Sequence, residues 1–186
     1  MANITLKNVR LSFNDLWTAV GFNEKTPVDQ YKFSATFLIE KGSENDKKIQ
    51  AAIVEAAKAK WGVNAEKILN QIKGNNNKFA YQDGDLKDYD GYAGHMSIKA
   101  NTKTRPVTVN KARIPVSEAD GVFYSGCYVN AVISVYAYDA SGNKGITAGL
   151  VGVQFAADGD AFGAGRPSVD EMFEVLADGN DAADFL

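Results

Sequence analysis

The sequence predicts a mainly β protein: a five-stranded antiparallel barrel with a helical insertion and an acidic C-terminal tail. About five segments alternate apolar and polar residues with the period of a strand, and only one segment is strongly helical. The 186 residues are enough for one well-buried core. From Asp158 onward the composition shifts to glycine, alanine and acid, so we expect one domain over residues 1–157 and a flexible tail over residues 158–186.

Two strands are predicted before the helical insertion. Residues 3–13 alternate along their length, and residues 31–40 place five apolar side chains on one face: Tyr31, Phe33, Ala35, Phe37 and Ile39. Between these strands, residues 14–30 contain Gly21, Pro27 and scattered polar residues. We therefore expect residues 14–30 to form a loop.

The helical insertion follows a break at Gly42. Ser43 is a suitable N-cap for a helix over residues 44–60, and Gly62 is a suitable end. A second short helix is predicted over residues 64–72. Residues 74–94 are rich in glycine, asparagine and aspartate, which predicts a long loop of the kind that often carries function.

Strand character returns in the second half of the chain. Strands are predicted over residues 95–102, 107–110, 127–139 and 144–156, and Ser141-Gly142-Asn143 supplies the turn between the last two. Residues 168–176 are predicted to form a helical turn or two within the tail. The resulting order places the main helix between the second and third strands of the barrel.

The charges of the chain are separated along its length. From Asp158 to the end there are eight acids and one base, so this part carries −7 and the preceding body +4, within an overall charge of −3. A basic body attracts a polyanion, and an acidic tail can compete for the same surface. We expect the tail to bind partner proteins through Asp178, Asp181, Asp184 and Phe185.

Other function classes are disfavoured by what the sequence lacks. The N-terminus has no basic-then-apolar signal sequence, and no apolar run approaches the roughly 18 residues of a membrane span. One cysteine and one histidine cannot form a disulfide or a zinc site by themselves. We expect a cytoplasmic protein without membrane association, metal or cofactor.

Cations and aromatic residues provide candidate contacts to a nucleic acid. Residues 99–113 hold five cations and no acid, and several tyrosines lie opposite apolar strand faces or in glycine-rich segments. Rings interleaved with cations suit an unpaired strand. The alternatives are a solvated strand edge for the lysines and core packing for about half of the tyrosines. The candidates are Trp17, Lys32, Tyr89, Tyr92, Lys99, Lys103, Arg105, Lys111, Arg113, Tyr124, Tyr128 and Tyr136.

Catalytic interpretations are weaker. Asp83, Asp85, Asp88 and Asp90 could hold metal in a nuclease, although a solvated turn explains them better, and they do not fit a calcium loop of the EF-hand type. His95 and Cys127 could form a nucleophilic pair, but neither lies in a known nucleophile motif. Gly159, Gly163 and Gly165 do not form a phosphate loop. A metal-dependent DNA nuclease and a structural or scaffold protein are the alternatives to a binding protein.

Several short motifs resemble one family. Residues 125–131 (SGCYVNA), 149–155 (GLVGVQF) and 158–163 (DGDAFG), with 103–106 (KTRP) and 119–121 (ADG), resemble the phage single-stranded DNA-binding proteins catalogued as a domain of unknown function, DUF2815. The resemblance implies an oligonucleotide-binding (OB) barrel that coats single-stranded DNA during phage replication or recombination, in the cytoplasm of the host. It covers most of residues 94–163.

The last residues resemble the acidic, aromatic-ended tails of other replication single-strand binders, including those of T7-type phages. That resemblance implies a tail that docks replication partners and restrains binding to duplex DNA. Here Leu186 follows Phe185, so the aromatic residue is not terminal. The expected partners are single-stranded DNA, replication or recombination proteins, and further copies of the chain along the DNA. We expect binding without sequence preference and without catalysis.

Overall fold

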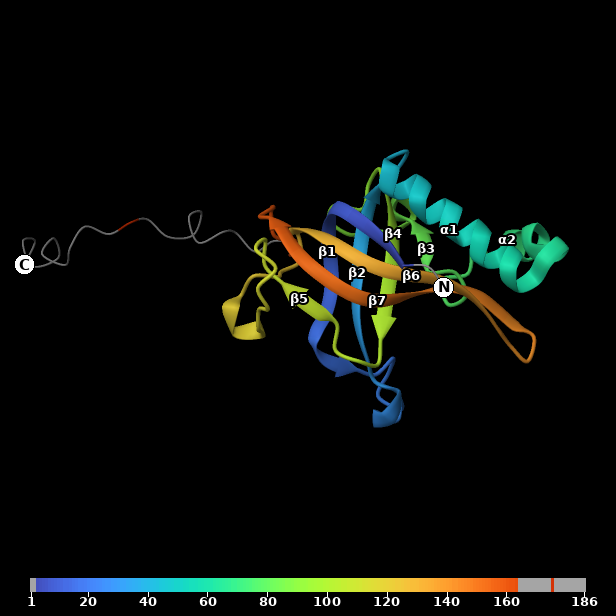
Figure 1. The fold of residues 1–186 in the computed structure, drawn as a ribbon, viewed down its shortest axis with the longest axis horizontal. Helices are drawn as coiled ribbons and strands as arrows, with labels where there is room; N and C mark the ends of the chain where they lie inside the picture. The colour runs from blue at the N-terminus through green and yellow to red at the C-terminus, as the bar shows by residue number, and fades with distance from the viewer. Residues whose placement is uncertain (1–2, 164–174, 176–186) are drawn as a thin grey trace, which may run out of the picture.

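Five strands form a closed barrel in the computed structural model, which describes residues 3–163 and Val175. These strands are β1 (Asn3–Val20), β2 (Lys32–Glu40), β4 (His95–Thr102), β6 (Tyr128–Ala140) and β7 (Asn143–Ala157). They follow the order β4-β2-β1-β6-β7, and a pairing of β4 with β7 closes the ring (Figure 1). The predicted OB-like barrel is confirmed. One detail differs, because the closing pair of Asn101 with Gly149 is parallel whereas the other four pairings are antiparallel.

The core lies inside this barrel and is built by alternation along the strands. Ala35, Phe37 and Ile39 of β2 are fully buried, as predicted from their shared face. Val129 and Ile133 of β6 meet them from another wall. Each strand of the barrel therefore has one face that points into the core and one that points outward.

Strand β1 differs most from expectation. It continues to Val20, through residues predicted as a loop, and its pairing shifts register three times: between Leu6 and Val9, between Ser12 and Asn14, and between Asp15 and Val20. Each shift changes which side chains face inward, so the simple two-face alternation predicted for residues 3–13 was wrong. At the second shift Phe13 is the additional residue, and its side chain is 56% exposed.

Two helices cover one side of the barrel. Helix α1 (Glu44–Trp61) begins at the predicted cap, where the Ser43 hydroxyl accepts a hydrogen bond from the Asp46 amide at 3.3 Å. Helix α2 (Ala65–Ile72) follows, so both predicted helices are confirmed. Figure 1 shows α1 lying across the barrel, where it packs mainly against β6.

The segment over residues 74–94 is more ordered than a plain loop. It contains the short strand β3 (Tyr81–Asp83), which pairs with β4, and a 3₁₀ turn at Gly84–Leu86. The Tyr81 hydroxyl donates to Asp46 at 2.5 Å and so ties β3 to the first turn of α1. A further short strand, β5 (Val107–Val109), lies parallel to β7.

Several predictions lie outside the described residues. They are the helical turn over residues 168–176, apart from Val175, and the partner-binding residues Asp178, Asp181, Asp184 and Phe185. Among the described helices, none is long and apolar enough to cross a membrane.

Candidate nucleic-acid interface

A groove lined by lysines lies on the outer face of β2 and β4. It is a hollow of about 810 Å³ between these strands and the connection from β1 to β2. Its charged lining residues are all cationic: Lys25, Lys32, Lys99 and Lys103. Within residues 3–163, none of these four lysines takes part in an ion pair. We call this hollow the lysine groove.

Strand alternation and pairing create this groove. Phe33, Ala35, Ile98 and Ala100 alternate with polar residues, so β2 and β4 turn their polar side chains outward. Ser34 pairs with Asn101 and Thr36 with Lys99, which sets these outward side chains side by side. The wall opposite is the β1–β2 connection, where the Asn23 side chain accepts from the Lys25 amide at 2.9 Å and shapes the turn.

The lysine groove continues toward the β6–β7 hairpin. A second hollow of about 400 Å³ shares Lys32, Lys99 and Asn101 with the first. It adds Tyr136 and Tyr138 of β6, both half-buried, and the amide side chains of Asn76 and Asn77. Figure 1 shows the β1–β2 connection and the β6–β7 hairpin projecting from the barrel at the bottom and lower right. These two loops are the ones that bind oligonucleotides in OB barrels.

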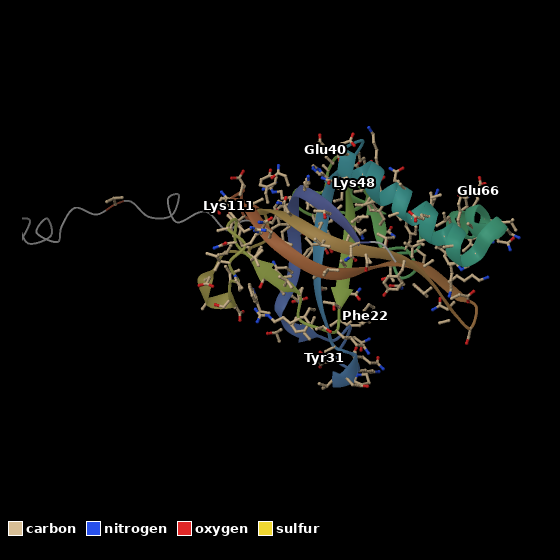
Figure 2. All side chains as sticks on the ribbon, in the orientation of Figure 1. Phe22, Tyr31, Glu40, Lys48, Glu66 and Lys111 are labelled. Atoms are coloured by element: carbon tan, nitrogen blue, oxygen red, sulfur yellow. The ribbon has the colours of Figure 1, made fainter. Side chains whose placement is uncertain are left out.

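Phe22 is a groove residue that was not among the sequence candidates. Its side chain is 86% exposed, lines the lysine groove and belongs to the projecting β1–β2 connection (Figure 2). The available signal was a large apolar side chain beside Gly21 in a polar segment. A flat ring at the edge of a cationic groove can stack on a base.

Three of the predicted cations lie outside the groove. Arg105 stacks on the Trp17 ring, 5.1 Å from its centroid, just beyond Lys103. Lys111 lies 5.9 Å from the centroid of Phe155, and Figure 2 places it well away from Phe22. Arg113 is exposed in the same short loop as Lys111. The predicted cations therefore lie in three places. Lys32, Lys99 and Lys103 line the groove, Arg105 lies on Trp17, and Lys111 and Arg113 lie in a more distant loop.

Tyr124 and Tyr128 contact the chain itself. The Tyr124 hydroxyl donates to Asp158 at 2.7 Å, and burial, reinforced by this bond, raises the pKa of Tyr124. Tyr128 lies beside Arg10, whose guanidinium is 4.2 Å from the centroid of Phe162 and donates to the Asp160 carbonyl at 2.6 Å. Residues 158–163 thus lie against the barrel, although the sequence placed them in the tail.

The two tyrosines of the long loop are placed differently. Tyr92 is only 2% exposed, and its hydroxyl is 3.0 Å from that of Ser12, so it offers no free ring face for a base. The expectation that Tyr92 stacks on DNA is therefore not supported. Tyr89 is 54% exposed and packs edge-on against Phe13, with 5.0 Å between the ring centroids. It lies outside the lysine groove.

The residues considered for a metal-dependent nuclease or a nucleophilic pair make other contacts in the structure. The Lys41 ammonium contacts Asp83 and Asp85 at 2.6 Å each, and these hydrogen bonds lower the pKa of both carboxyl groups. Cys127 is fully buried, and burial raises the pKa of its thiol, the opposite of an activated nucleophile. Among the described residues, no three histidine, cysteine or acidic side chains are grouped to hold a metal.

A closed five-stranded barrel with a cationic groove over its second and third strands defines an OB-type nucleic-acid-binding protein. Comparison with known families is more specific. Residues 2–186 match the family described as the Enterobacter phage Enc34 ssDNA-binding protein. The chain belongs to this family, a non-enzymatic class. This match confirms the class indicated by the sequence motifs, a phage single-stranded DNA-binding protein; the matched family carries the Enc34 description and not the DUF2815 label.

Individual relatives agree with the family match. The chain is 46% identical over 179 residues to protein p50 of Acyrthosiphon pisum secondary endosymbiont phage 1, covering 92% of this chain and 93% of the relative. It is similar to the bacteriophage Enc34 single-stranded DNA-binding protein in complex with ssDNA, with TM-score 0.65 and 26% identity over 87% of this chain and 89% of the other. The fold is also shared with gp2.5 of bacteriophage T7, at TM-score 0.50 and 10% identity over 90% and 98% of the two chains.

Proposed function

We propose that this protein binds single-stranded DNA in the lysine groove, without sequence preference, and coats it during phage DNA replication or recombination. The observation that carries the proposal is the groove itself: four lysines that make no ion pair with any other described residue, and one exposed aromatic ring, on the face that OB barrels use for oligonucleotides. The Enc34 relative, solved with ssDNA, supports the same ligand. The proposed place of action is the cytoplasm of the host cell.

The chemistry of the groove suits an unpaired strand. Ammonium groups of Lys32, Lys99 and Lys103 contact phosphates and release counterions, which gives affinity to any sequence. Phe22 at one end and Tyr136 near the other offer ring faces, and every base can stack on such a face. In duplex DNA the base faces are stacked on each other, so this second contribution favours single strands.

The acidic tail has a proposed role in partner recruitment and in limiting duplex binding. The pinned segment over residues 158–163 supports it, because it fixes where the tail leaves the barrel. The Phe162 ring lies against Gly91 and stacks on Arg10 of β1. A tail with excess negative charge that is tethered to the barrel by this segment stays at high local concentration around the barrel that carries the groove.

A salt titration with matched variants tests the groove. Binding of poly-dT, followed by quenching of intrinsic fluorescence, is measured at several salt concentrations for Lys32→Gln/Lys99→Gln/Lys103→Gln and for a control, Lys58→Gln/Lys60→Gln/Lys67→Gln, on the helices. Each lost phosphate contact reduces the slope of log K against log salt by about 0.7, so the groove variant loses about 2. The control keeps the wild-type slope. Equal slopes for both triple variants would contradict the proposal.

A further inference from the structure

A third hollow on the outer surface is lined by acidic side chains, in contrast to the lysine groove. It has a volume of about 360 Å³ and lies between β1, the loop after β3 and the end of the pinned segment. Its walls include the rings of Phe13, Tyr89 and Phe162 and the carboxylates of Asp88 and Asp90. No cation lines it. We call it the Phe13–Tyr89 hollow.

The two exposed rings are held in place before any partner arrives. The register shift in β1 turns Phe13 outward, where it meets Tyr89 at 77° between ring planes. Tyr89 is supported in turn by Tyr92, 5.2 Å away, and the Tyr92 hydroxyl is fixed against Ser12. Binding to a preformed aromatic surface costs little side-chain entropy. Two large apolar side chains, each more than half exposed and in contact, are typical of an interaction surface.

The charges decide which class of partner fits. Both charged groups that line the hollow are negative, so a phosphate backbone would be repelled. A guanidinium group can make two kinds of favourable contact here, because it can stack on a ring and donate hydrogen bonds to a carboxylate. Arg10 already makes the first of these contacts at the border of the hollow, 4.2 Å from the centroid of Phe162.

We propose that the Phe13–Tyr89 hollow docks an arginine side chain of a partner protein, between the exposed rings and the carboxylates of Asp88 and Asp90. This surface is separate from the lysine groove and shares no lining residue with it. A partner can therefore be held while DNA occupies the groove. This inference does not depend on the acidic tail and adds a recruitment site on the barrel.

Fluorine NMR of the full-length protein tests the proposal directly. With 4-fluorophenylalanine at position 13, the protein is titrated with the capped peptide Gly-Arg-Leu-Arg-Gly and with the same peptide carrying citrulline, which has the shape of arginine without its charge. We expect a saturable shift of the fluorine signal with the arginine peptide and at least five-fold weaker binding of the citrulline peptide. The double variant Asp88→Asn/Asp90→Asn weakens the arginine peptide at least five-fold. The control Glu55→Gln/Glu66→Gln, which removes two exposed acids elsewhere, changes it less than two-fold.

Three results would overturn the inference. Equal binding of both peptides, or full binding to Asp88→Asn/Asp90→Asn, would show that charge does not select the ligand. A loss of poly-dT affinity greater than five-fold in Phe13→Ser/Tyr89→Ser would assign the hollow to the DNA path instead, with the proposed function intact. Failure of the groove lysine variants to weaken poly-dT would contradict the proposed function and leave the peptide result standing.

Discussion

Phe22 lies 86% exposed at the edge of the lysine groove, in a segment that the sequence predicts only as a loop. An exposed phenylalanine ring gains no burial energy in the folded protein, so folding does not explain it. Val28, in the same connection, is 78% exposed but does not line the groove. Comparing substitutions at Phe22 and Val28 therefore distinguishes base stacking in the groove from a general effect of exposed apolar surface.

Replacing Phe22 by alanine is expected to weaken binding to an oligo-dT by roughly five-fold to a hundred-fold, since one stacked base contributes about 1–3 kcal/mol. Fluorescence anisotropy of a labelled oligonucleotide at fixed salt measures the change. Val28→Ala is the matched control and keeps wild-type affinity. Equal affinities for Phe22→Ala and the native chain would exclude stacking at this position.

A second residue, Asp46, links α1 to β3 through a buried carboxylate. Its side chain accepts from the Tyr81 hydroxyl at 2.5 Å and from the Gly42 amide at 2.8 Å. Burial favours the neutral acid, but these hydrogen bonds favour the carboxylate more strongly, so the pKa of Asp46 is lowered. A lowered folded-state pKa means that this stabilisation is complete above the unfolded-state pKa and is lost as pH falls through the folded-state value.

The Asp46→Asn variant is therefore expected to lower the free energy of unfolding by about 1–3 kcal/mol at pH 7, because buried donors lose a charged acceptor. As the pH falls below about 4, the carboxyl of the unfolded chain binds a proton before that of the folded chain, so the difference in stability between the native protein and the Asp46→Asn variant shrinks. Urea unfolding at pH 7 and pH 3 measures both quantities. Asp29→Asn, at an exposed turn, is the control and is expected to leave the free energy of unfolding unchanged at pH 7. A difference that stays constant with pH would refute the charge argument.

Among the elements, the pinned segment over residues 158–163 is held against the barrel largely by one cation. Arg10 donates to the carbonyl groups of Gly126 and Asp160 and stacks on Phe162. The Phe162 amide also donates to the Ser125 carbonyl at 2.9 Å. The predicted boundary after residue 157 separates two parts that are in contact, so we propose that the domain extends to Gly163.

Replacing Arg10 by alanine should release this segment, because two charge-assisted hydrogen bonds and one cation–π contact are lost together. Limited digestion with chymotrypsin, read by mass spectrometry, measures cleavage after Phe162. We expect cleavage several-fold faster than in the native chain. Lys7→Ala, an exposed cation on the same strand, is the control. An unchanged rate at Phe162 would show that Arg10 does not hold the segment.

The sequence predicted most elements correctly where a single period persists. The alternation of β2 and of the β6–β7 hairpin, and the cap at Ser43, needed no tertiary information. Strand β1 was cut short because its bulges interrupt alternation just before Gly21 and Pro27, which signal a loop. Tyr92 was misjudged because its burial depends on distant Ser12 rather than on local sequence. Lys32 and Lys99 could be predicted from strand alternation, but Lys25, which was not among the candidates, and Phe22 could not be assigned without the projecting connection.

For the whole molecule, charges of opposite sign gather on different surfaces of the barrel, in addition to their separation along the sequence. The lysine groove carries only positive lining charges, and the Phe13–Tyr89 hollow carries only negative ones. The chain beyond the pinned segment, residues 164–186, holds six acids and one base, so ending the chain after Gly163 changes the net charge from −3 to +2. Long-range attraction of any nucleic acid should rise with that change.

Ending the chain after Gly163 is therefore expected to tighten binding to both single-stranded and duplex DNA, with the larger gain for duplex. Duplex DNA gains more because it depends on phosphate contacts alone, whereas stacking on Phe22 already holds single strands in competition with the tail. Gel shifts with matched oligonucleotides at low and high salt measure the ratio. The gain should shrink as salt rises, because the competition is electrostatic. A control chain of full length, with the six acids beyond residue 163 changed to their amides, should behave like the truncated one. If it behaved like the native chain instead, the tail would act through its length or its apolar residues rather than its charge.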